Sequence, residues 1–437
     1  MSAVTDEIRL AALDAVRPLH LGRVAGLLGI RVTVTGLSAA VGELLEILGP
    51  ERVVPVEVVA SSPGQLTCLP LGDTTGLRAG DPVRSTGSGL RIGVGEALRG
   101  RVLDGLGRPI DDGPALVGLD EVPVEHPAPH ALQRPRIDRQ LGLGVRALDA
   151  LTPCGRGQRL GFMAGSGVGK SSLLSMIARG TDAEISVIAL IGERGREVRE
   201  FLENDLGPEG LRRSVVVVAT SDQPAVVRLR AAFVATRIAE SFRDAGRHVV
   251  LMMDSLTRVA LAQREIGLSA GEPPATRGYP PSVFALLPKL LERAGTSPEG
   301  SITGLYTVLV EGDDLQDPVG DSARSILDGH VVLSRDLATA GHFPSIDVLE
   351  SVSRVANAVT SPANRADATR LRRLLAAYRS VKELVEIGAY VAGTDADADD
   401  ALALMARINA FLRQDLEDTS EVAPTWAALH ELVGVAS

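Results

Sequence analysis

The first regular pattern in the chain has a period of two. Between residues 22 and about 91, short runs alternate apolar with polar side chains, as in residues 30–35 and 54–58. Glycine-rich turns, for example residues 72–76 and 87–89, separate these runs. Short, evenly spaced strands that are joined by such turns are typical of small antiparallel barrels. The pattern therefore predicts a β-barrel in this part of the chain.

The middle of the chain alternates two kinds of segment. Continuous apolar runs of strand length are followed by stretches with helical spacing, such as residues 225–243. The strand candidates are residues 159–163, 186–191, 214–219, 248–253 and 304–310. Strands that are buried on both faces and alternate with helices indicate a mostly parallel sheet. Residues 100–140 are rich in turns and prolines, so we expect a linker that wraps onto this sheet domain.

Helical spacing alone marks both ends of the chain. Residues 4–16 predict a short amphipathic helix, because their apolar residues recur every fourth position. From about Asp367 onward the apolar positions follow the pattern i, i+3, i+4, i+7, and residues 401–412 repeat it. We therefore expect four parts. They are an N-terminal amphipathic helix (residues 1–20), a β-barrel (21–92), an α/β domain (93–365) and a C-terminal helical domain (366–437).

Composition narrows the classes of function. The formal net charge of the 437 residues is −10, and no aromatic residue precedes Phe162. Single-strand nucleic-acid binders need aromatic stacking platforms and a basic groove, so we expect no nucleic-acid partner. Two cysteines cannot build a disulfide framework or a zinc site, and no apolar run approaches about 18 residues. These features favour a protein of the cytoplasm.

A glycine-rich segment follows the strand candidate at residues 159–163. It consists of Gly165, Ser166, Gly167, Val168, Gly169, Lys170, Ser171 and Ser172, and it leads into a helical stretch. Glycines let successive backbone N–H groups turn toward one point, and the start of a helix adds its positive dipole end. The segment predicts a P-loop, with Lys170 reaching the β- and γ-phosphates of ATP and Ser171 holding Mg²⁺. Ala164 stands where the first glycine of this motif usually lies.

Two further apolar strands lead into acidic residues. Residues 248–253 end at Asp254, which in a P-loop enzyme belongs to the Mg²⁺ shell. Its alternative role is a cap for the next helix. Residues 186–191 lead into Glu193, which can polarise the attacking water because the carboxyl ends of parallel strands share one edge with the P-loop. The alternative for Glu193 is a solvated, charged loop.

Taken together, several segments resemble a known family, the catalytic subunits of rotary ATP synthases and their relatives. They are the P-loop, Gly192-Glu193-Arg194, Asp254-Ser255-Leu256-Thr257-Arg258 and Pro344-Ser345-Ile346-Asp347-Val348-Leu349-Glu350-Ser351-Val352-Ser353. Residues 263–284 and Glu311-Gly312-Asp313-Asp314 look more like one branch, the flagellar and type III secretion ATPases. The resemblance covers nearly the whole chain. It implies an α/β, RecA-like P-loop core with a mostly parallel sheet, preceded by a small N-terminal β-barrel and followed by a C-terminal helical domain.

The resemblance also implies roles for single residues. Glu193 matches the glutamate that activates water, and its neighbours match a catalytic arginine (Arg194) and a metal-side acid (Glu197). Asp254 matches the acid of the metal shell, and Arg258 matches an arginine near the γ-phosphate. Phe343 matches an aromatic ring that stacks on adenine, and Tyr390 borders the same pocket. Arg354 matches the arginine finger that a neighbouring subunit inserts.

A chain that carries both a catalytic half-site and a finger can close a ring of identical sites. An arginine finger can act in trans, and head-to-tail interfaces close into rings. We therefore expect a homohexameric, Mg²⁺-dependent ATPase that energises flagellar type III protein export, peripheral to the cytoplasmic face of the inner membrane. The resemblance puts a negative regulator or stator protein on the N-terminal helix. It puts export-gate proteins, chaperones and exported substrates on the C-terminal helices.

Other functions share parts of this pattern. An injectisome ATPase would look much the same, and the sequence does not separate it from a flagellar one. A catalytic subunit of a proton- or sodium-coupled rotary synthase would need a second, homologous subunit for activity. A ring helicase would be stimulated by RNA, which the aromatic-free N-terminal region argues against. A non-enzymatic nucleotide-binding scaffold would need neither Glu193 nor Arg354.

Overall fold

The computed structural model describes residues 20–310 and 317–434. The helix expected at residues 4–16 and the segment Glu311-Gly312-Asp313-Asp314 lie outside the described residues. The chain divides into two compact units, one with residues 20–91 and Ile266–Glu272 and the other with the remainder. Within the described ranges, no helix combines the length and the apolar character needed to span a membrane.

The first unit contains a closed antiparallel barrel. Its strands are β1 (Gly22–Leu28), β2 (Arg31–Thr35), β3 (Leu44–Leu48), β4 (Val53–Ser62), β5 (Gln65–Pro70) and β6 (Pro82–Ser85), in the order β1-β2-β5-β4-β3-β6. The barrel predicted from the alternating pattern is confirmed, since Val32, Val34 and Val56 all lie in its core. Ile30 departs from the pattern. It lies in the turn between β1 and β2 and is 42% exposed.

The second unit is built around a mostly parallel sheet with the strand order β19-β18-β12-β17-β15-β13-β14-β8. The strands are β8 (Val102–Asp104), β12 (Arg159–Ala164), β13 (Ile185–Glu193), β14 (Ser214–Thr220), β15 (His248–Asp254), β17 (Ser301–Leu309), β18 (Gly329–Leu333) and β19 (Ile346–Ser353). Neighbours run parallel except for β18 and β19, and the short β16 (Gly295–Thr296) pairs antiparallel with β17. Every strand candidate from the sequence overlaps an observed strand, so the predicted α/β class is confirmed.

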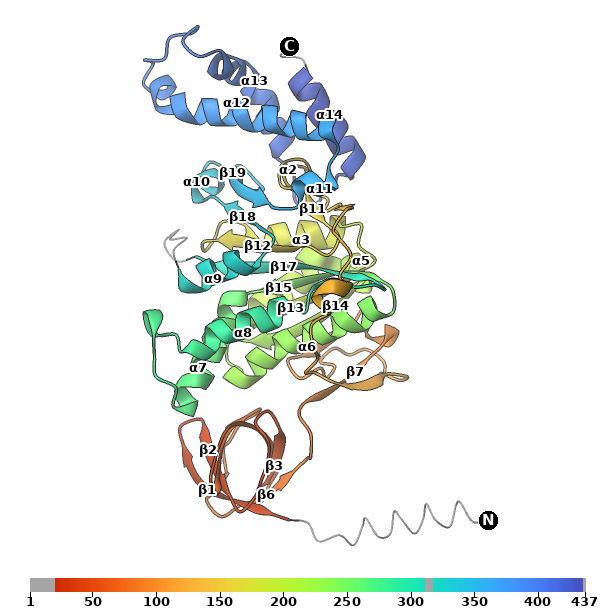
Figure 1. The fold of residues 1–437 in the computed structure, drawn as a ribbon, viewed down its shortest axis with the longest axis vertical. Helices are drawn as coiled ribbons and strands as arrows, with labels where there is room; N and C mark the ends of the chain where they lie inside the picture. Colours follow the sequence, from red (N-terminus) through yellow and green to blue (C-terminus); the bar gives the residue numbers. More distant parts are fainter. Residues whose placement is uncertain (1–19, 311–316, 435–437) are drawn as a thin grey trace, which may run out of the picture. The chain divides into compact units, whose positions relative to one another are not determined.

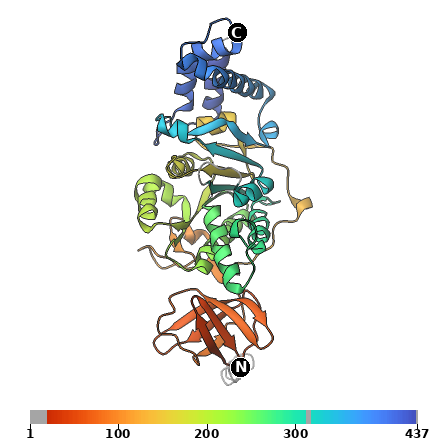
Figure 2. The ribbon, with the colours of Figure 1, turned by 90° about the vertical axis from the view of Figure 1, so that its left-hand side faces the viewer.

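Helices cover both faces of this sheet (Figures 1 and 2). The helices between residues 146 and 359 are α2 (Arg146–Leu151), α3 (Lys170–Gly180), α4 (Gly195–Glu200), α5 (Gly207–Arg212), α6 (Ala225–Asp244), α7 (Leu256–Ala270), α8 (Pro281–Leu291), α9 (Pro318–Ile326), α10 (Arg335–Thr339) and α11 (Ala356–Val359), and the end of α7 from Ile266 belongs to the first unit. The longest of them, α6, packs along β13, β14 and β15. Because both faces are covered, almost every residue of β13 is buried. This explains the continuous apolar run in its sequence.

The segment expected to be a linker is partly a strand. Within residues 100–140, Val102–Asp104 form β8 and add the outer strand beside β14. Residues 123–125 lie against α6, where Arg237 donates to the carbonyl of Pro123 at 3.2 Å and Arg230 donates to Glu125 at 2.6 Å. Further short elements complete the chain between the main strands. They are β7 (Arg91–Val94), β9 (Asp120–Pro123), β10 (Gln140–Leu141), β11 (Cys154–Gly155), the short 3₁₀ turns η1 (Glu96–Leu98), η2 (Ala131–Gln133) and η4 (Thr276–Gly278), and the π-helical turn η3 (Phe201–Leu206).

The C-terminal part is helical, as the sequence predicts. Its helices are α12 (Pro362–Glu386), α13 (Ala396–Leu412) and α14 (Val422–Gly434), which pack on one another and on α2 (Figure 1). Leu371 and Leu374 of the predicted apolar stripe are buried, and Leu375 and Tyr378 pack against the same core. One side of α12 also contacts β19, the outermost strand of the sheet.

Candidate functional site

The loop between β12 and α3 has the geometry of an anion cradle. Gly167 and Gly169 have φ angles of 76° and 91°, in the left-handed region that favours glycine. Lys170 is the first residue of α3, so the unpaired backbone N–H groups of the first helical turn point toward the loop. Within the predicted phosphate loop, Gly165 and Val168 are buried while Ser166, Gly167, Ser171 and Ser172 are exposed. The loop can therefore present both backbone and side-chain donors to a phosphate.

Three residues from outside the loop touch it. The Ser345 hydroxyl donates to the carbonyl of Val168 at 2.5 Å, and the guanidinium of Arg335 donates to the carbonyl of Ser166 at 3.3 Å. Phe343 is 46% exposed, and its ring lies close to Gly169. A Cβ atom added to Gly169 would be 3.4 Å from the ring. Phe343 therefore borders the loop, in a place suited to stack on a base. The sequence did not predict roles for Ser345 or Arg335.

Two carboxylates converge on the lysine of the loop. The ammonium nitrogen of Lys170 lies 2.5 Å from Oδ1 of Asp254 and 3.5 Å from Oε1 of Glu193. Asp254 ends β15 and Glu193 ends β13, and these strands are parallel neighbours. The structure thus brings together Lys170, Asp254 and Glu193, which the sequence proposes for phosphate, metal and water. It does so at the shared carboxyl edge of the sheet.

Asp254 has a second partner that the sequence did not predict. The hydroxyl of Thr307 on β17 donates to the same Oδ1 atom at 2.7 Å. The side chain of Asp254 is only 5% exposed, so its charge needs such partners. A possible signal was present in the sequence, because Thr307 interrupts the otherwise apolar end of β17.

The surroundings of Glu193 keep its carboxyl group poised to take up a proton. Burial raises the pKa of Glu193 above its ordinary value, while the charge of Lys170 acts in the opposite sense. The charge of Asp254 and a hydrogen bond with Glu197 raise the pKa further, and Arg258 lowers it. A base that works near neutral pH benefits from a pKa raised in this way.

The two candidate arginines of this region have different surroundings. The guanidinium of Arg258 donates to the carbonyl of Gly192 at 2.6 Å and so supports the end of β13 beside Glu193. Arg194 donates to Glu197 at 3.2 Å, but its side chain is 77% exposed. Arg258 is therefore tied to the strand that carries Glu193, whereas Arg194 is mostly exposed to solvent.

The donor groups at this edge fit Mg²⁺. Mg²⁺ prefers hard oxygen ligands and is usually bound by one or two protein groups together with substrate phosphates. Asp254 supplies a carboxylate and Ser171 an exposed hydroxyl on the first turn of α3. Glu197, the third predicted metal-side residue, is engaged with Arg194 and Glu193. Among the residues that are described, no group of three His, Cys, Asp or Glu side chains could hold a metal alone.

Two predicted site residues lie apart from this cluster. Arg354 directly follows β19, is exposed, and donates to the carbonyl of Arg324 at 3.2 Å. Tyr390 lies between α12 and α13, where its hydroxyl donates to Asp399 at 2.9 Å. In the described part of the chain, neither residue is hydrogen-bonded to the phosphate loop or to Glu193. Their roles toward a neighbouring subunit and toward adenine stay predictions.

Thr307→Val tests the support of Asp254. Valine has the shape of threonine without the hydroxyl, so Asp254 loses one of its two partners. Loss of a group that orients a metal-side carboxylate typically costs about 10-fold or more in metal affinity or activity. We expect nucleotide hydrolysis to need about 10-fold more free Mg²⁺, as measured by titration at fixed nucleotide. Thr307→Ser keeps the hydroxyl and serves as the control. An unchanged Mg²⁺ requirement in the valine variant would contradict the assignment.

The raised pKa of Glu193 predicts the acid limb of the pH–rate profile. The base must be deprotonated, so kcat/KM should fall as the pH drops through a value above the ordinary glutamate pKa of about 4.3. Glu197→Ala removes a hydrogen bond that raises this pKa. The acid limb should then move to lower pH, whereas Glu203→Ala, on the exposed face of η3, should leave it in place. A wild-type limb at the ordinary glutamate value would refute this account.

Comparison with known proteins agrees with these features. The nucleotide-binding domain of the ATP synthase alpha/beta family matches residues 144–353, and the C-terminal domain described as T3SS EscN ATPase matches residues 360–431. The flagellum-specific ATP synthase of Bacillus subtilis is 47% identical over 94% of this chain and 95% of its own length. The type 3 secretion system ATPase of Xanthomonas euvesicatoria is 48% identical over 95% of this chain and 94% of its own.

Solved structures give the same result. The assembled ATPase EscN in complex with its central stalk EscO, from the type III secretion system of enteropathogenic E. coli, has a TM-score of 0.88 to this chain. It is 44% identical and covers 94% of this chain and 100% of its own. Fold, site geometry and identity over nearly the whole length agree. The chain therefore belongs to the flagellar and type III secretion ATPases of the ATP synthase alpha/beta family.

Proposed function

We propose that this ATPase works as a Mg²⁺-dependent homohexameric ring that energises protein export through the flagellar type III apparatus. The observation that carries the proposal is the arrangement of charged residues at two separate places. Lys170, Asp254 and Glu193 form one cluster beside the phosphate loop, while Arg354 is exposed after β19. The chain thus contains a nucleotide site that lacks an arginine finger and, at a separate place, an exposed arginine that can serve as the finger of another site. This is the combination that a ring of identical subunits needs.

Each residue of the cluster has a distinct task in the proposed reaction. Lys170 neutralises the β- and γ-phosphates. To do so, its ammonium group leaves Asp254 and contacts the phosphate oxygens instead. Ser171 and Asp254 hold Mg²⁺, which when bound neutralises the charge that develops on the phosphate oxygens. Glu193 orients the attacking water and takes up its proton. Arg258 keeps the end of β13 in place, and Phe343 stacks on the adenine ring.

The proposed ring rests on Arg354. An arginine finger stabilises the charge on the transferring phosphoryl group and can be supplied by a neighbouring subunit. The exposure of Arg354 and its separation from Glu193 within the chain fit insertion into the next subunit. The assembled state named for the related EscN structure supports the same arrangement. In a rotary synthase, by contrast, finger and catalytic glutamate belong to different kinds of subunit.

The proposed partners and location follow the division of the chain. Residues 1–20, for which the sequence predicts an amphipathic helix, are the binding segment for a regulator or stator protein. The C-terminal helices α12 to α14 receive export-gate proteins, chaperones and exported substrates. The protein acts in the cytoplasm, peripheral to the inner membrane at the export apparatus. We favour the flagellar over the injectisome apparatus because nothing in the sequence demands a host-directed machine.

Glu193→Ala tests the catalytic part of this proposal. We expect kcat to fall at least about 100-fold, because removal of a general base typically costs 10²–10⁴ in rate. Binding of ATP, measured with a fluorescent analogue, should change little since the phosphate loop is intact. Glu209→Ala, an exposed acid on α5, is the matched control and should hydrolyse ATP normally. Hydrolysis at the wild-type rate by Glu193→Ala would contradict the site assignment.

The same variants test the biological part of the proposal. A strain that lacks this gene should grow no flagellar filaments, and the wild-type chain and Glu209→Ala should restore them. Glu193→Ala should not restore them. If the deletion strain builds filaments normally but loses needle-dependent secretion, the protein belongs to an injectisome instead.

A further inference from the structure

Helix α12 carries a row of arginines on one face. Arg365, Arg372 and Arg379 are spaced by seven residues, and we call them the arginine ladder. Seven residues of α-helix fall about 20° short of two full turns, so the three side chains share one face at steps of about 10.5 Å. Each arginine of the ladder donates a hydrogen bond to the same stretch of chain, residues 347–360. That stretch contains Arg354.

The rung farthest from the start of α12 holds the beginning of β19. The Nη2 atom of Arg379 donates to both carboxylate oxygens of Asp347, at 2.7 and 2.8 Å, and Nη1 donates to Glu350 at 3.2 Å. Asp347 also accepts from two backbone N–H groups of its own turn. The side chain of Arg379 is 49% exposed, so this contact fixes geometry more than it adds stability.

The middle rung caps the free edge of the sheet. Arg372 donates through Nη2 to the carbonyl of Ser351 at 3.0 Å and to the carbonyl of Leu151 at 2.7 Å. β19 is the last strand of the sheet and pairs with β18 on one side alone, so its outward carbonyls need another donor. Burial lowers the pKa of Arg372, and the charge of Asp347 acts in the opposite sense. The half-buried guanidinium of Arg372 thus gives the Ser351 carbonyl a hydrogen bond that a neighbouring strand would otherwise provide.

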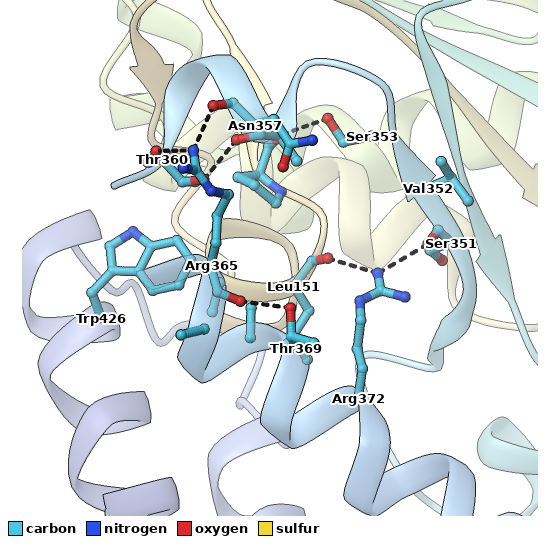
Figure 3. A pocket seen from close by; sticks show the side chains of 15 residues that line it. Leu151, Ser351, Val352, Ser353, Asn357, Thr360, Arg365, Thr369, Arg372 and Trp426 are labelled. Atoms are coloured by element: carbon cyan, nitrogen blue, oxygen red, sulfur yellow. Dashed lines mark hydrogen bonds between the residues drawn. The ribbon is translucent and has the colours of Figure 1, made fainter. Parts of the chain in front are cut away.

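The first rung holds the turn that follows Arg354. Arg365 donates to the carbonyls of Asn357 and Thr360, at 2.7 and 2.9 Å. Figure 3 shows Arg365 and Arg372 pointing from α12 toward this turn and toward Ser351, with Trp426 of α14 near Arg365. They line a cavity of about 480 Å³ that, within the described residues, contains no acidic side chain. The two guanidinium groups are therefore held by backbone carbonyls.

We propose that the arginine ladder is a set of positioning residues for Arg354, through which the C-terminal helices control ATP hydrolysis in the neighbouring subunit. This inference rests on the proposed function, since it takes Arg354 to be a finger that acts in trans. The ladder holds the segment before, beside and after Arg354 at three points on one rigid helix. A shift of α12 along or around its axis moves all three points together and changes where Arg354 enters the next site.

The contacts around α12 explain why it would move as one body. α12 also packs against α13 and α14, and Arg373 pairs with Asp397 of α13 at 3.1 Å. The Arg354 segment, in turn, is anchored to the core by β18 and by Gln158, which donates to Ser353 at 3.1 Å. A partner that pulls on the C-terminal helices therefore acts on Arg354 through the ladder. The physical path consists of hydrogen bonds between named groups.

Arg379→Ala and Arg372→Ala test the ladder. A misplacement of a catalytic group by about 1 Å can cost roughly 100-fold in rate, so we expect kcat to fall about 10- to 100-fold. KM for ATP should change little, because each variant's own phosphate loop is intact. Arg373→Ala is the control, since it removes an arginine from the same helix without touching β19. A kcat within twofold of the control in both ladder variants would overturn the proposal.

The cavity allows a rescue experiment that guards against misfolding. Arg372→Ala removes the guanidinium and two methylene groups from the cavity wall, which leaves room for low millimolar guanidinium to enter and bind the carbonyls of Ser351 and Leu151. We expect kcat of Arg372→Ala to recover several-fold, while Arg373→Ala shows no response. If Arg372→Ala does not fold, Arg379→Ala still decides, because its side chain is half exposed and supports little of the core.

Mixed rings separate a positioning role from a general defect. Arg379→Ala subunits keep an intact catalytic site but carry a misplaced finger, whereas Glu193→Ala subunits keep the finger and lose the site. When the two are mixed before assembly in equal amounts, about a quarter of the sites should combine a working Glu193 with a well-placed neighbouring Arg354. The mixture should then hydrolyse ATP faster than the average of the two separate proteins.

A parallel mixture of Arg354→Ala with Glu193→Ala tests the trans action of Arg354 separately from the positioning role of the ladder. If this mixture gains activity but the mixture with Arg379→Ala does not, the ladder proposal is wrong and the trans finger stands. If neither mixture gains activity, the trans finger itself is wrong, and the ladder proposal falls with it. Gain in both mixtures supports the ladder.

Discussion

The site depends on one ammonium group held between two carboxylates. Asp254 and Glu193 end neighbouring parallel strands, where their charges would repel each other strongly at low exposure. Lys170 offsets that repulsion from the start of α3, 2.5 Å from Asp254. The same ammonium group is the one that a phosphate would attract, so phosphate and Asp254 compete for it. The phosphate loop, the proposed metal-side acid Asp254 and the proposed base Glu193 are therefore linked through a single charge.

This constraint explains a feature of the composition. The chain has 45 basic residues, and only Lys170, Lys289 and Lys382 are lysines. At the last ladder position the forked guanidinium is the better group, since Arg379 reaches Asp347 with one nitrogen and Glu350 with the other. In the glycine-lined loop a compact ammonium is needed, and the guanidinium fork does not substitute for it. One of the three exceptions to the arginine bias, Lys170, thus lies where the chemistry requires a lysine.

Sequence patterns predicted the architecture well because they report burial. Period-two alternation marked the barrel, and continuous apolar runs marked strands such as β13 and β15 that are covered on both faces. Lys170, Asp254 and Glu193 could be proposed because they follow strands whose ends must meet at one edge. β8, β18 and β19 were missed as strands because none of them has a long apolar run, and β8 and β19 also lie at the two edges of the sheet.

Contacts that depend on distant segments could not be predicted in the same way. Thr307 reaches Asp254 across 53 positions of sequence, and Ser345 reaches Val168 across 177. The ladder was also invisible, because Arg365 and Arg372 donate to backbone carbonyls, which every residue has. A charge pattern on a helix does not reveal such partners. Only the packing of α12 against β19 shows that three arginines hold the segment that carries Arg354.

The central claim is that a complete site needs residues from two copies of this chain. Specific ATPase activity as a function of protein concentration tests it most directly, with the oligomeric state followed by light scattering in the same samples. The account predicts low activity in dilute, monomeric protein and a steep rise in activity per chain as rings assemble. Activity per chain that stays constant from monomer to ring would contradict it.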